Sequence, residues 1–460
     1  MYILFPIQDK RLTTLPYSRI RSFREETYRT WMAEGFFDFK GYLRAGAVTT
    51  ADTDNGPVSY TRLIKHNPAC RNLWISQIIS NTGDWFSSIA VLGLTLHLTQ
   101  SGFALSLMML CQMAPSFLMA PLAGVVADRF DRKKVMILSD LLRATVSLGF
   151  LLVHTAEDVW LIFLSASLLS GCSPFFDAAK NATLPSIAKG RSLLAANALS
   201  SATWGLTLTV GAAIGGLIAA QFGRSVAFEL NAMSFVLSAV FVARVALPAA
   251  SKASQPARFF VDFVEGLRYI RKDRTTRVFL PVKATWGLAG GSAVLLYAVF
   301  GGQVFNAGDA GIAILYTARG LGTLIGTVGM KAFSALQLPR LRWGILIGLL
   351  GYGFSFIGVS FAPSIWLAAS FIMLSTCGSM IMWVFSSLGL QLVVDENLRG
   401  RVFAADSGLF TLSFALSTVG AGLLLESNTP RMVSLWVGVF GMGLSLVWFY
   451  FARRIPLVSR

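Results

Sequence analysis

The chain has 460 residues, of which 54% are hydrophobic and 13% charged, and its mean hydropathy is +0.62. A soluble globular protein carries about a quarter charged residues, so this chain has too little polar surface for a water-soluble body and its apolar excess must face lipid. The net charge of +16 does not indicate nucleic-acid binding, because the basic residues lie between apolar segments, as in membrane proteins.

Residues 1–70 precede the first long apolar segment and carry many arginines and aromatic residues without clear periodicity. We expect a mobile, dispensable cytoplasmic arm. A regulatory arm, a surface-lying anchor and an upstream extension, with Met32 as an alternative start, stay open as other interpretations. The first long apolar run begins after residue 70, which is too late for a cleavable signal peptide.

Twelve segments have the roughly 20 mainly apolar residues that a spanning helix needs. They are residues 73–97, 103–126, 135–155, 158–179, 192–221, 225–246, 279–301, 310–332, 343–362, 364–387, 405–426 and 432–452. Six fall in residues 71–247 and six in residues 279–452, followed by a cytoplasmic tail at 453–460. The sequence therefore predicts an all-α membrane protein with twelve transmembrane helices in two six-helix halves.

The distribution of positive charge predicts the orientation. If both termini are cytoplasmic, most of the 39 Lys and Arg residues fall in cytoplasmic segments such as 129–134, 180–191 and 252–277. The outer loops then hold only Arg224 and Arg431. The opposite orientation would place nearly all of this charge outside, against the positive-inside bias. We predict a multi-pass protein with both termini in the cytoplasm.

Residues 248–278 separate the two predicted halves. This linker begins with Pro248 and small polar residues and then becomes amphipathic, with Phe260, Phe263 and Leu267 on one helical face. A helix on the cytoplasmic membrane surface fits this pattern, and so does a helix packed against the protein's own loops. A short repeat, Lys-Gly-Arg at 189–191 and Arg-Gly-Arg at 399–401, suggests that the halves are related about an axis along the membrane normal.

The loop after the second predicted span combines a glycine with acidic and basic residues at a helix end: Gly124, Asp128, Arg129, Asp131, Arg132 and Lys133. The glycine allows helices to approach closely, and the first carboxylate can pair with cations or accept from helix N-termini. The basic side chains can meet carboxylates or lipid phosphates. Such a cluster can hold one conformation and release it in another.

This loop resembles the signature loop of the major facilitator superfamily, Gly-x-x-x-Asp-Arg-x-Gly-Arg-Arg/Lys, with Asp131 in place of a glycine. Residues 83–86 (Gly-Asp-Trp-Phe), 138–143, 182–185 and 399–402 are similar to the branch that contains macrolide efflux proteins and enterobactin-type siderophore exporters. The stretch 211–216 departs from the Gly-Pro-x-x-Gly-Gly of many proton antiporters, because Ala212 stands where proline is expected. Its small residues still permit tight helix packing.

The resemblance implies a fold, a function and a mechanism. It implies a bacterial inner-membrane protein whose halves rock around a midplane site. It also implies a secondary exporter of small amphipathic molecules, of drug or siderophore type, working as a proton antiporter for drug resistance or siderophore export. The expected conformational latch comprises the six loop residues together with Asp140, Arg143, Arg399 and Arg401. Asp140 and Arg143 are expected to form a local pair or to join the loop network.

Charged residues inside spans are costly and usually face a cavity or a partner. Asp84, near the middle of the first span, is a candidate for coupling proton entry to substrate exit; the alternative is a fixed ion pair. Arg319 could bind an anionic substrate group or pair with a carboxylate such as Asp84 or Glu229. Lys283, near a cytoplasmic helix end, is expected to extend toward the membrane surface.

The candidate substrate cavity is rich in aromatic residues, which bind amphipathic compounds by contact area and cation–π interaction. Its predicted members are Trp85, Gln112, Trp204, Trp286, Tyr316, Trp383 and Phe410. Each aromatic residue could instead serve packing or face lipid.

Other functional classes are disfavoured. The chain has no Gly-x-x-x-x-Gly-Lys-Ser/Thr phosphate loop, which argues against a primary pump. Its three histidines, His66, His97 and His154, are isolated, so we expect no enzyme, no metal site and no cofactor. The expected partners are a small-molecule substrate, protons and membrane lipids, with no nucleic acid, and a monomer. An importer or lipid transporter on the same fold, or a non-transporting receptor, remains the alternative.

Overall fold

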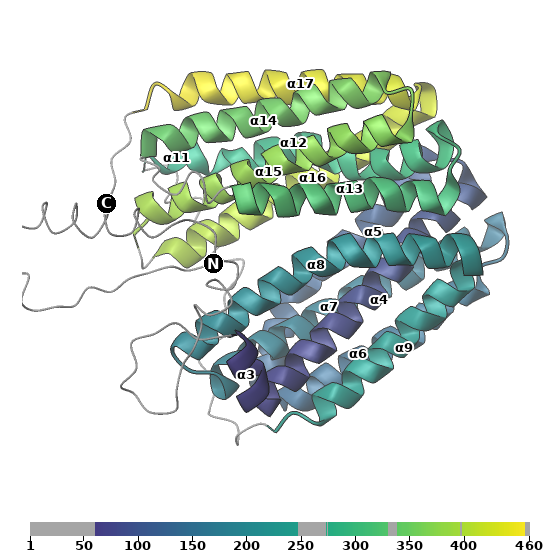
Figure 1. Cartoon of the computed structure of the whole chain (residues 1–460), viewed down its shortest axis with the longest axis vertical. Coiled ribbons are helices and arrows are strands. Elements are labelled where there is room, and N and C mark those ends of the chain that lie inside the picture. The colour runs from purple at the N-terminus through teal and green to yellow at the C-terminus, as the bar shows by residue number, and fades with distance from the viewer. Residues whose placement is uncertain (1–59, 247–272, 274, 330–337, 396–397, 456–460) are drawn as a thin grey trace, which may run out of the picture.

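The computed structural model describes residues 60–246, 273, 275–329, 338–395 and 398–455. The N-terminal arm up to residue 59 and the amphipathic part of the linker lie outside the described residues. Within the described part every regular element is helical, and the helices form two groups that Figure 1 shows one above the other.

The first group begins with the short α3 (Tyr60–His66), which precedes six long helices. These are α4 (Pro68–Thr99), α5 (Gly102–Arg129), α6 (Arg132–Leu148), α7 (Val159–Ile187), α8 (Arg191–Phe222) and α9 (Arg224–Ala243), with the 3₁₀ turns η1 (Gly149–Leu152) and η2 (Ala156–Asp158) between α6 and α7. Polar residues in the connections cap the helices. Asn67, Ser101 and Asp131 accept hydrogen bonds from the backbone N–H groups three residues on, each at 3.0 Å.

The second group begins with α11 (Thr276–Phe279). It continues with α12 (Pro281–Val299), the π-helical turn η3 (Phe300–Val304), α13 (Gly308–Gly329), α14 (Leu338–Phe361), α15 (Ile365–Val393), α16 (Arg399–Ser427) and α17 (Pro430–Ala452). In the described part of the chain, ten helical segments are long and apolar enough to cross a membrane, and α4 and α13 are not among them. Polar residues including Asp84 in α4, and Arg319 together with several glycines in α13, lower the mean hydropathy of these two helices.

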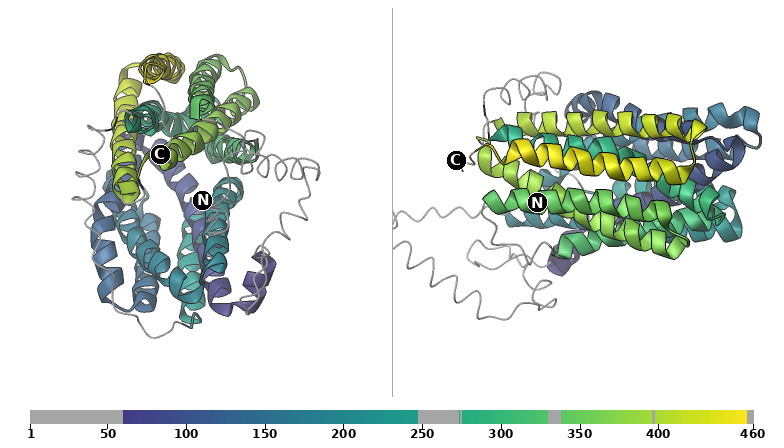
Figure 2. Two further views of the ribbon diagram at one scale, coloured as in Figure 1. Left: turned by 90° about the vertical axis from the view of Figure 1, so that its left-hand side faces the viewer. Right: turned by 90° about the horizontal axis from the view of Figure 1, so that it is seen from above.

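The two ends of the molecule differ in how closely the groups approach each other. We call the end that carries residues 129–131, between α5 and α6, the basic end, and the end that carries residues 100–101, between α4 and α5, the far end. The groups meet mainly through α8 with α13 and α5 with α16, and they diverge toward the basic end, where α3 lies (Figure 1). Seen from the basic end, the helices of each group occupy separate regions (Figure 2, left).

The small residues of α8 allow close helix packing, as predicted from residues 211–216. A Cβ atom at Gly215 would lie 2.7 Å from the Cα of Phe86 in α4, and one at Gly211 would lie 2.9 Å from the Cβ of Trp85. By contrast, a Cβ atom at Gly124 would meet nothing within 4 Å. The prediction that Gly124 serves close helix approach is therefore wrong for this conformation, because no helix in the described part of the chain packs against this position.

We expect Gly215→Leu to destabilise the protein by about 1–3 kcal/mol, because the side chain must enter the backbone of α4. Thermal unfolding of the purified protein in detergent measures this. The matched control is Gly443→Leu in the exposed part of α17, where a Cβ atom meets nothing within 4 Å. Equal unfolding temperatures for the two variants would contradict the tight α4–α8 contact.

Candidate functional site

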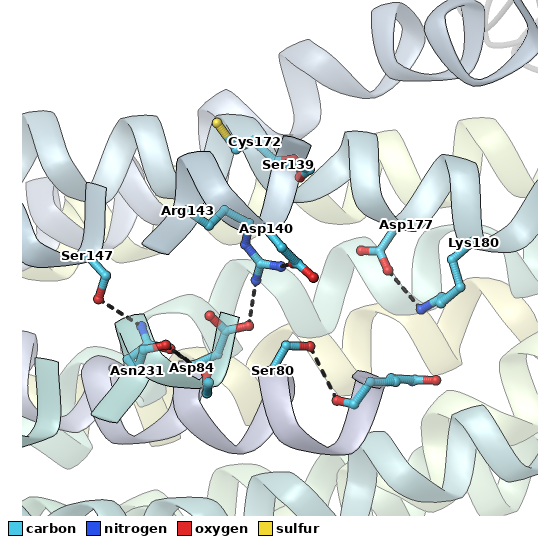
Figure 3. Close-up of polar contacts among 12 residues, drawn as sticks. Ser80, Asp84, Ser139, Asp140, Arg143, Ser147, Cys172, Asp177, Lys180 and Asn231 are labelled. Atoms are coloured by element: carbon cyan, nitrogen blue, oxygen red, sulfur yellow. Dashed lines mark hydrogen bonds and ion pairs between the residues drawn. The ribbon is translucent and has the colours of Figure 1, made fainter. Parts of the chain in front are cut away.

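A cluster of three charged side chains lies inside the first group. Arg143 of α6 donates to Asp84 of α4, with 2.8 Å between Nη2 and Oδ2, and to Asp140, with 3.4 Å between Nη1 and Oδ1 (Figure 3). The guanidinium carbon lies 4.0 Å from the ring centroid of Phe235 in α9. The cluster therefore joins three helices, and the predicted local pair of Asp140 and Arg143 is confirmed.

The three side chains differ in exposure, and this determines what the cluster can do. The side chain of Asp140 is 0% exposed and that of Arg143 is 5% exposed, whereas that of Asp84 is 33% exposed. Two carboxylates sharing one guanidinium carry a net charge of −1, so binding one proton would make the cluster neutral. Asp84 is the most exposed member of the cluster.

Polar contacts beside the cluster fix α6 against α9. Asn231 of α9 donates from Nδ2 to Ser147 Oγ at 3.3 Å, and Ser147 donates to the carbonyl of Phe228 at 3.3 Å (Figure 3). Nearby on α7, Lys180 and Asp177 form an ion pair at 2.8 Å, with the Asp177 side chain 55% exposed. The packed α6–α9 pair holds Arg143 in place, while Asp177 lies at an open surface.

The other predicted coupling residues lie elsewhere. Glu229 is exposed on α9, and Arg319 lies on α13 in the second group, with its guanidinium carbon 5.8 Å from the ring centroid of Tyr316. Neither Glu229 nor Asp84 is paired with Arg319 in the described structure, because Asp84 is held by Arg143 in its own group. The alternative in which Arg319 pairs with one of these carboxylates is therefore wrong for this conformation.

Three predicted cavity residues come together in the second group. Trp286 of α12 lies 5.9 Å from Phe410 and 6.1 Å from Trp383, measured between ring centroids, and Trp383 lies 5.0 Å from Phe410. Phe414, which the sequence did not single out, joins them at 6.3 Å from Trp286. Trp286 donates from Nε1 to Ser379 Oγ at 2.9 Å. We call Trp286, Trp383, Phe410 and Phe414 the aromatic cluster.

The remaining predicted cavity residues are dispersed. Trp85 of α4 and Tyr316 of α13 lie 6.4 Å apart across the two groups. Gln112 is half-buried on α5, where its carbonyl accepts a hydrogen bond from Ser170 at 2.5 Å. Trp204 is 53% exposed on α8. The structure thus places the predicted aromatic residues in two separate contact groups, with Gln112 and Trp204 apart from both, rather than around one cavity.

A second buried ion pair lies beside the aromatic cluster. Lys283 Nζ is 2.5 Å from Asp406 Oδ2, and the two side chains are 6% and 1% exposed. The prediction that Lys283 extends toward the membrane surface is wrong, because α16 supplies a buried carboxylate within its reach. One signal could have indicated this pair: α12 and α16 each carry a charged residue of opposite sign inside a predicted span.

The loop between α5 and α6 is tied to its own group. Arg132 donates from Nη1 to the carbonyl of Ala182 at 2.7 Å, and Lys133 donates to that of Val245 at 3.1 Å. Asp128 is half-buried and Arg129 exposed. In the second group, Arg399 donates from Nε to the carbonyl of Val394 at 3.2 Å, and Arg401 lies on the first turn of α16.

Polar contacts also join the two groups, and those found in the described part of the chain lie near the far end. Arg224 at the start of α9 binds both carboxylate oxygens of Asp309 at the start of α13, at 2.8 and 3.1 Å. Ser101 Oγ and the backbone N–H of Phe103 donate to Glu426 at 2.7 and 3.1 Å.

Arg224 and Asp309 also line a small cavity of about 100 Å³ together with His97. Sequence reasoning placed Arg224 only in an outer loop and missed this contact between the groups. The sequence signal for this contact was an arginine in an outer loop, where the positive-inside bias predicts few basic residues.

The comparisons with known proteins agree with this architecture. The family model described as transmembrane secretion effector matches residues 64–457. The MFS-type transporter YfiS of Bacillus subtilis (strain 168) is 28% identical over 387 residues, covering 82% of this chain and 89% of that protein. Macrolide efflux protein A of Streptococcus pyogenes is 22% identical, covering 77% of this chain and 88% of that protein.

The solved structures show the same fold. A mutant of the nucleoside transporter NupG superposes with a TM-score of 0.67 and 13% sequence identity, covering 83% of this chain and 99% of that chain. At this identity the likeness establishes the fold alone.

Proposed function

Because the chain belongs to the transmembrane secretion effector family of the major facilitator superfamily, we propose that it is a proton-coupled secondary exporter of small amphipathic molecules. The observation that supports export as the direction of transport is the similarity to macrolide efflux protein A over 77% of this chain. The candidate substrates are compounds of drug or siderophore type, and the aromatic cluster supplies the rings that would contact their apolar parts.

The proposed topology has twelve spans. Although α4 and α13 fall short of the hydropathy of the ten qualifying segments, each packs against helices that qualify. We assign six spans to α4–α9 and six to α12–α17. The positive charge at 129–134 places the basic end in the cytoplasm of a bacterium, with the protein in its inner membrane and both chain termini on the cytoplasmic side.

The proposed mechanism is alternating access. The contacts of Arg224 with Asp309 and of Ser101 with Glu426 close the far end, so this conformation takes substrate from the cytoplasm. Export then requires these contacts to break while the groups close at the basic end. The loop of α5 and α6, with Arg399 and Arg401 opposite, is the proposed latch of that second state.

Proton coupling is assigned to Asp84. Its carboxylate is the most exposed member of a cluster in which two carboxyl groups share one guanidinium, and a proton bound there would weaken its contact with Arg143 and loosen α4 from α6. In this scheme, proton binding and substrate release alternate at α4.

The test is accumulation of dyes, macrolides and siderophores in an efflux-deficient bacterium that produces the protein. We expect lower accumulation of at least one compound than in vector-only cells, and a protonophore should abolish the difference. If accumulation is unchanged across the panel while the protein is present in the membrane, export is wrong and an importer or lipid transporter is favoured.

A further inference from the structure

The buried ion pair of the second group has an incomplete set of partners. Lys283 binds Asp406 Oδ2, and no donor within the described ranges reaches the other carboxylate oxygen, Oδ1, although it is buried. A buried carboxylate oxygen without a donor costs free energy. The missing hydrogen bond to Oδ1 therefore either destabilises the protein or is supplied by a ligand that donates to this oxygen.

The ammonium group of Lys283 already occupies the position that a cationic ligand would take. Its Nζ lies 4.8 Å from the ring centroid of Trp383 and 5.6 Å from that of Phe403. These distances are in the range of cation–π attraction. Trp383 in turn contacts Trp286 and Phe410 of the aromatic cluster, so a carboxylate, an ammonium group and a set of partly exposed rings form one continuous site.

We propose that Asp406 recognises a protonated amine on the exported molecule, with the substrate's ammonium group displacing Lys283 or binding Oδ1 beside it while its apolar part rests on the aromatic cluster. Lys283 is then an intramolecular counter-ion that neutralises the Asp406 carboxylate when no substrate is bound. The inference rests on the proposed function and specifies its substrate class as amphipathic amines.

The position of the pair suits substrate entry in this conformation. Lys283 lies in the first turn of α12 and Asp406 in the second turn of α16, so both are near the basic end, where the two groups diverge (Figure 1). A compound arriving from that side would reach this end of the second group before the contacts that close the far end, and it would have to part the buried pair to bind.

Binding is tested with the full-length protein in lipid nanodiscs and a matched pair of probes. Dansylcadaverine carries a primary amine that is protonated at pH 7, and its N-acetyl derivative is neutral but otherwise alike. Energy transfer from tryptophan to the dansyl group measures binding, since Trp286 and Trp383 lie in the proposed site. We expect the amine to bind about tenfold more tightly than the acetylated probe, as a charge-assisted contact and cation–π attraction predict.

Two variants identify the residues responsible. Asp406→Asn should remove the preference for the amine while leaving the neutral probe bound. Lys283→Arg should keep the pair and the fold but lower amine affinity by about threefold or more, because a guanidinium holds a carboxylate through two parallel hydrogen bonds. Asp177→Asn, which makes the same charge change at an exposed pair of the first group, should leave the preference unchanged.

Three results would overturn the inference: equal affinity of the two probes for the unaltered protein, a preference that survives Asp406→Asn, or tighter binding of the anionic dansylglycine than of the amine. If Asp406→Asn does not fold, Lys283→Arg alone tests the inference. Unchanged amine affinity in Lys283→Arg would then show that the substrate's ammonium group does not displace Lys283. The binding experiment does not depend on transport. A failure of amine recognition can therefore be distinguished from a failure of the proposed export function, which the accumulation assay tests.

Discussion

Asp84→Asn is expected to abolish transport driven by a proton gradient while preserving exchange of substrate across the membrane. Asparagine has nearly the size of aspartate and can still accept a hydrogen bond from Arg143, but it cannot bind and release a proton. The cluster of Asp84, Arg143 and Asp140 would then stay neutral, as if permanently protonated. Gradient-driven transport should fall by about a hundredfold or more, since loss of a proton-transfer group typically costs 10²–10⁴.

Inside-out vesicles separate the two possible roles of Asp84. Gradient-driven uptake measures coupling, and exchange of labelled for unlabelled substrate without a gradient measures the remaining transport cycle. A coupling role predicts loss of the first with retention of the second. Loss of both, with a lower unfolding temperature, would show that the ion pair only holds α4 against α6, because breaking a buried pair is strongly destabilising. Glu157→Gln, which removes an exposed carboxylate in the turn η2, is the control.

The apolar segments predicted the helices closely, because twenty consecutive apolar residues leave few alternatives in a membrane. The fifth predicted span, 192–221, corresponds to α8 (Arg191–Phe222), and the first, 73–97, to the longer α4. The pair of Asp140 and Arg143 could be predicted as well, because residues three apart share a helix face.

Contacts between distant helices could not be predicted in the same way. Arg143 meets Asp84 across 59 positions of sequence, and Lys283 meets Asp406 across 123. Apolar patterning gives each helix its approximate ends, but in membrane helices that are apolar on most sides it does not give the rotation of each helix or its neighbours. The sequence therefore could not decide whether Arg319 pairs with a carboxylate, and it did not indicate the partner of Lys283.

Reversing one charge of the Arg224–Asp309 pair is expected to open the far end. In Arg224→Asp two carboxylates would face each other where a bidentate pair now joins α9 to α13. Coupling energies of close charge pairs between protein surfaces are about 1.5 kcal/mol or more, which corresponds to at least a tenfold change in the ratio of closed to open molecules. The double variant Arg224→Asp/Asp309→Arg restores opposite charges and should return the ratio toward its original value.

The accessibility of Leu96→Cys to a membrane-impermeant maleimide measures this opening, because Leu96 is 4% exposed and lines the small cavity beside the ion pair. The four native cysteines are first replaced by alanine. Labelling from outside should accelerate about tenfold or more in Arg224→Asp and slow again in the double variant.

Arg431→Asp is the matched control, since Arg431 is another arginine near the far end but donates to the carbonyls of Ser360 and Ala362 within its own group. If Arg431→Asp accelerates labelling equally, or if the double variant fails to slow it, local charge rather than this pair sets the accessibility. Arg224 and Asp309 would then be neighbours at the far end and not its gate.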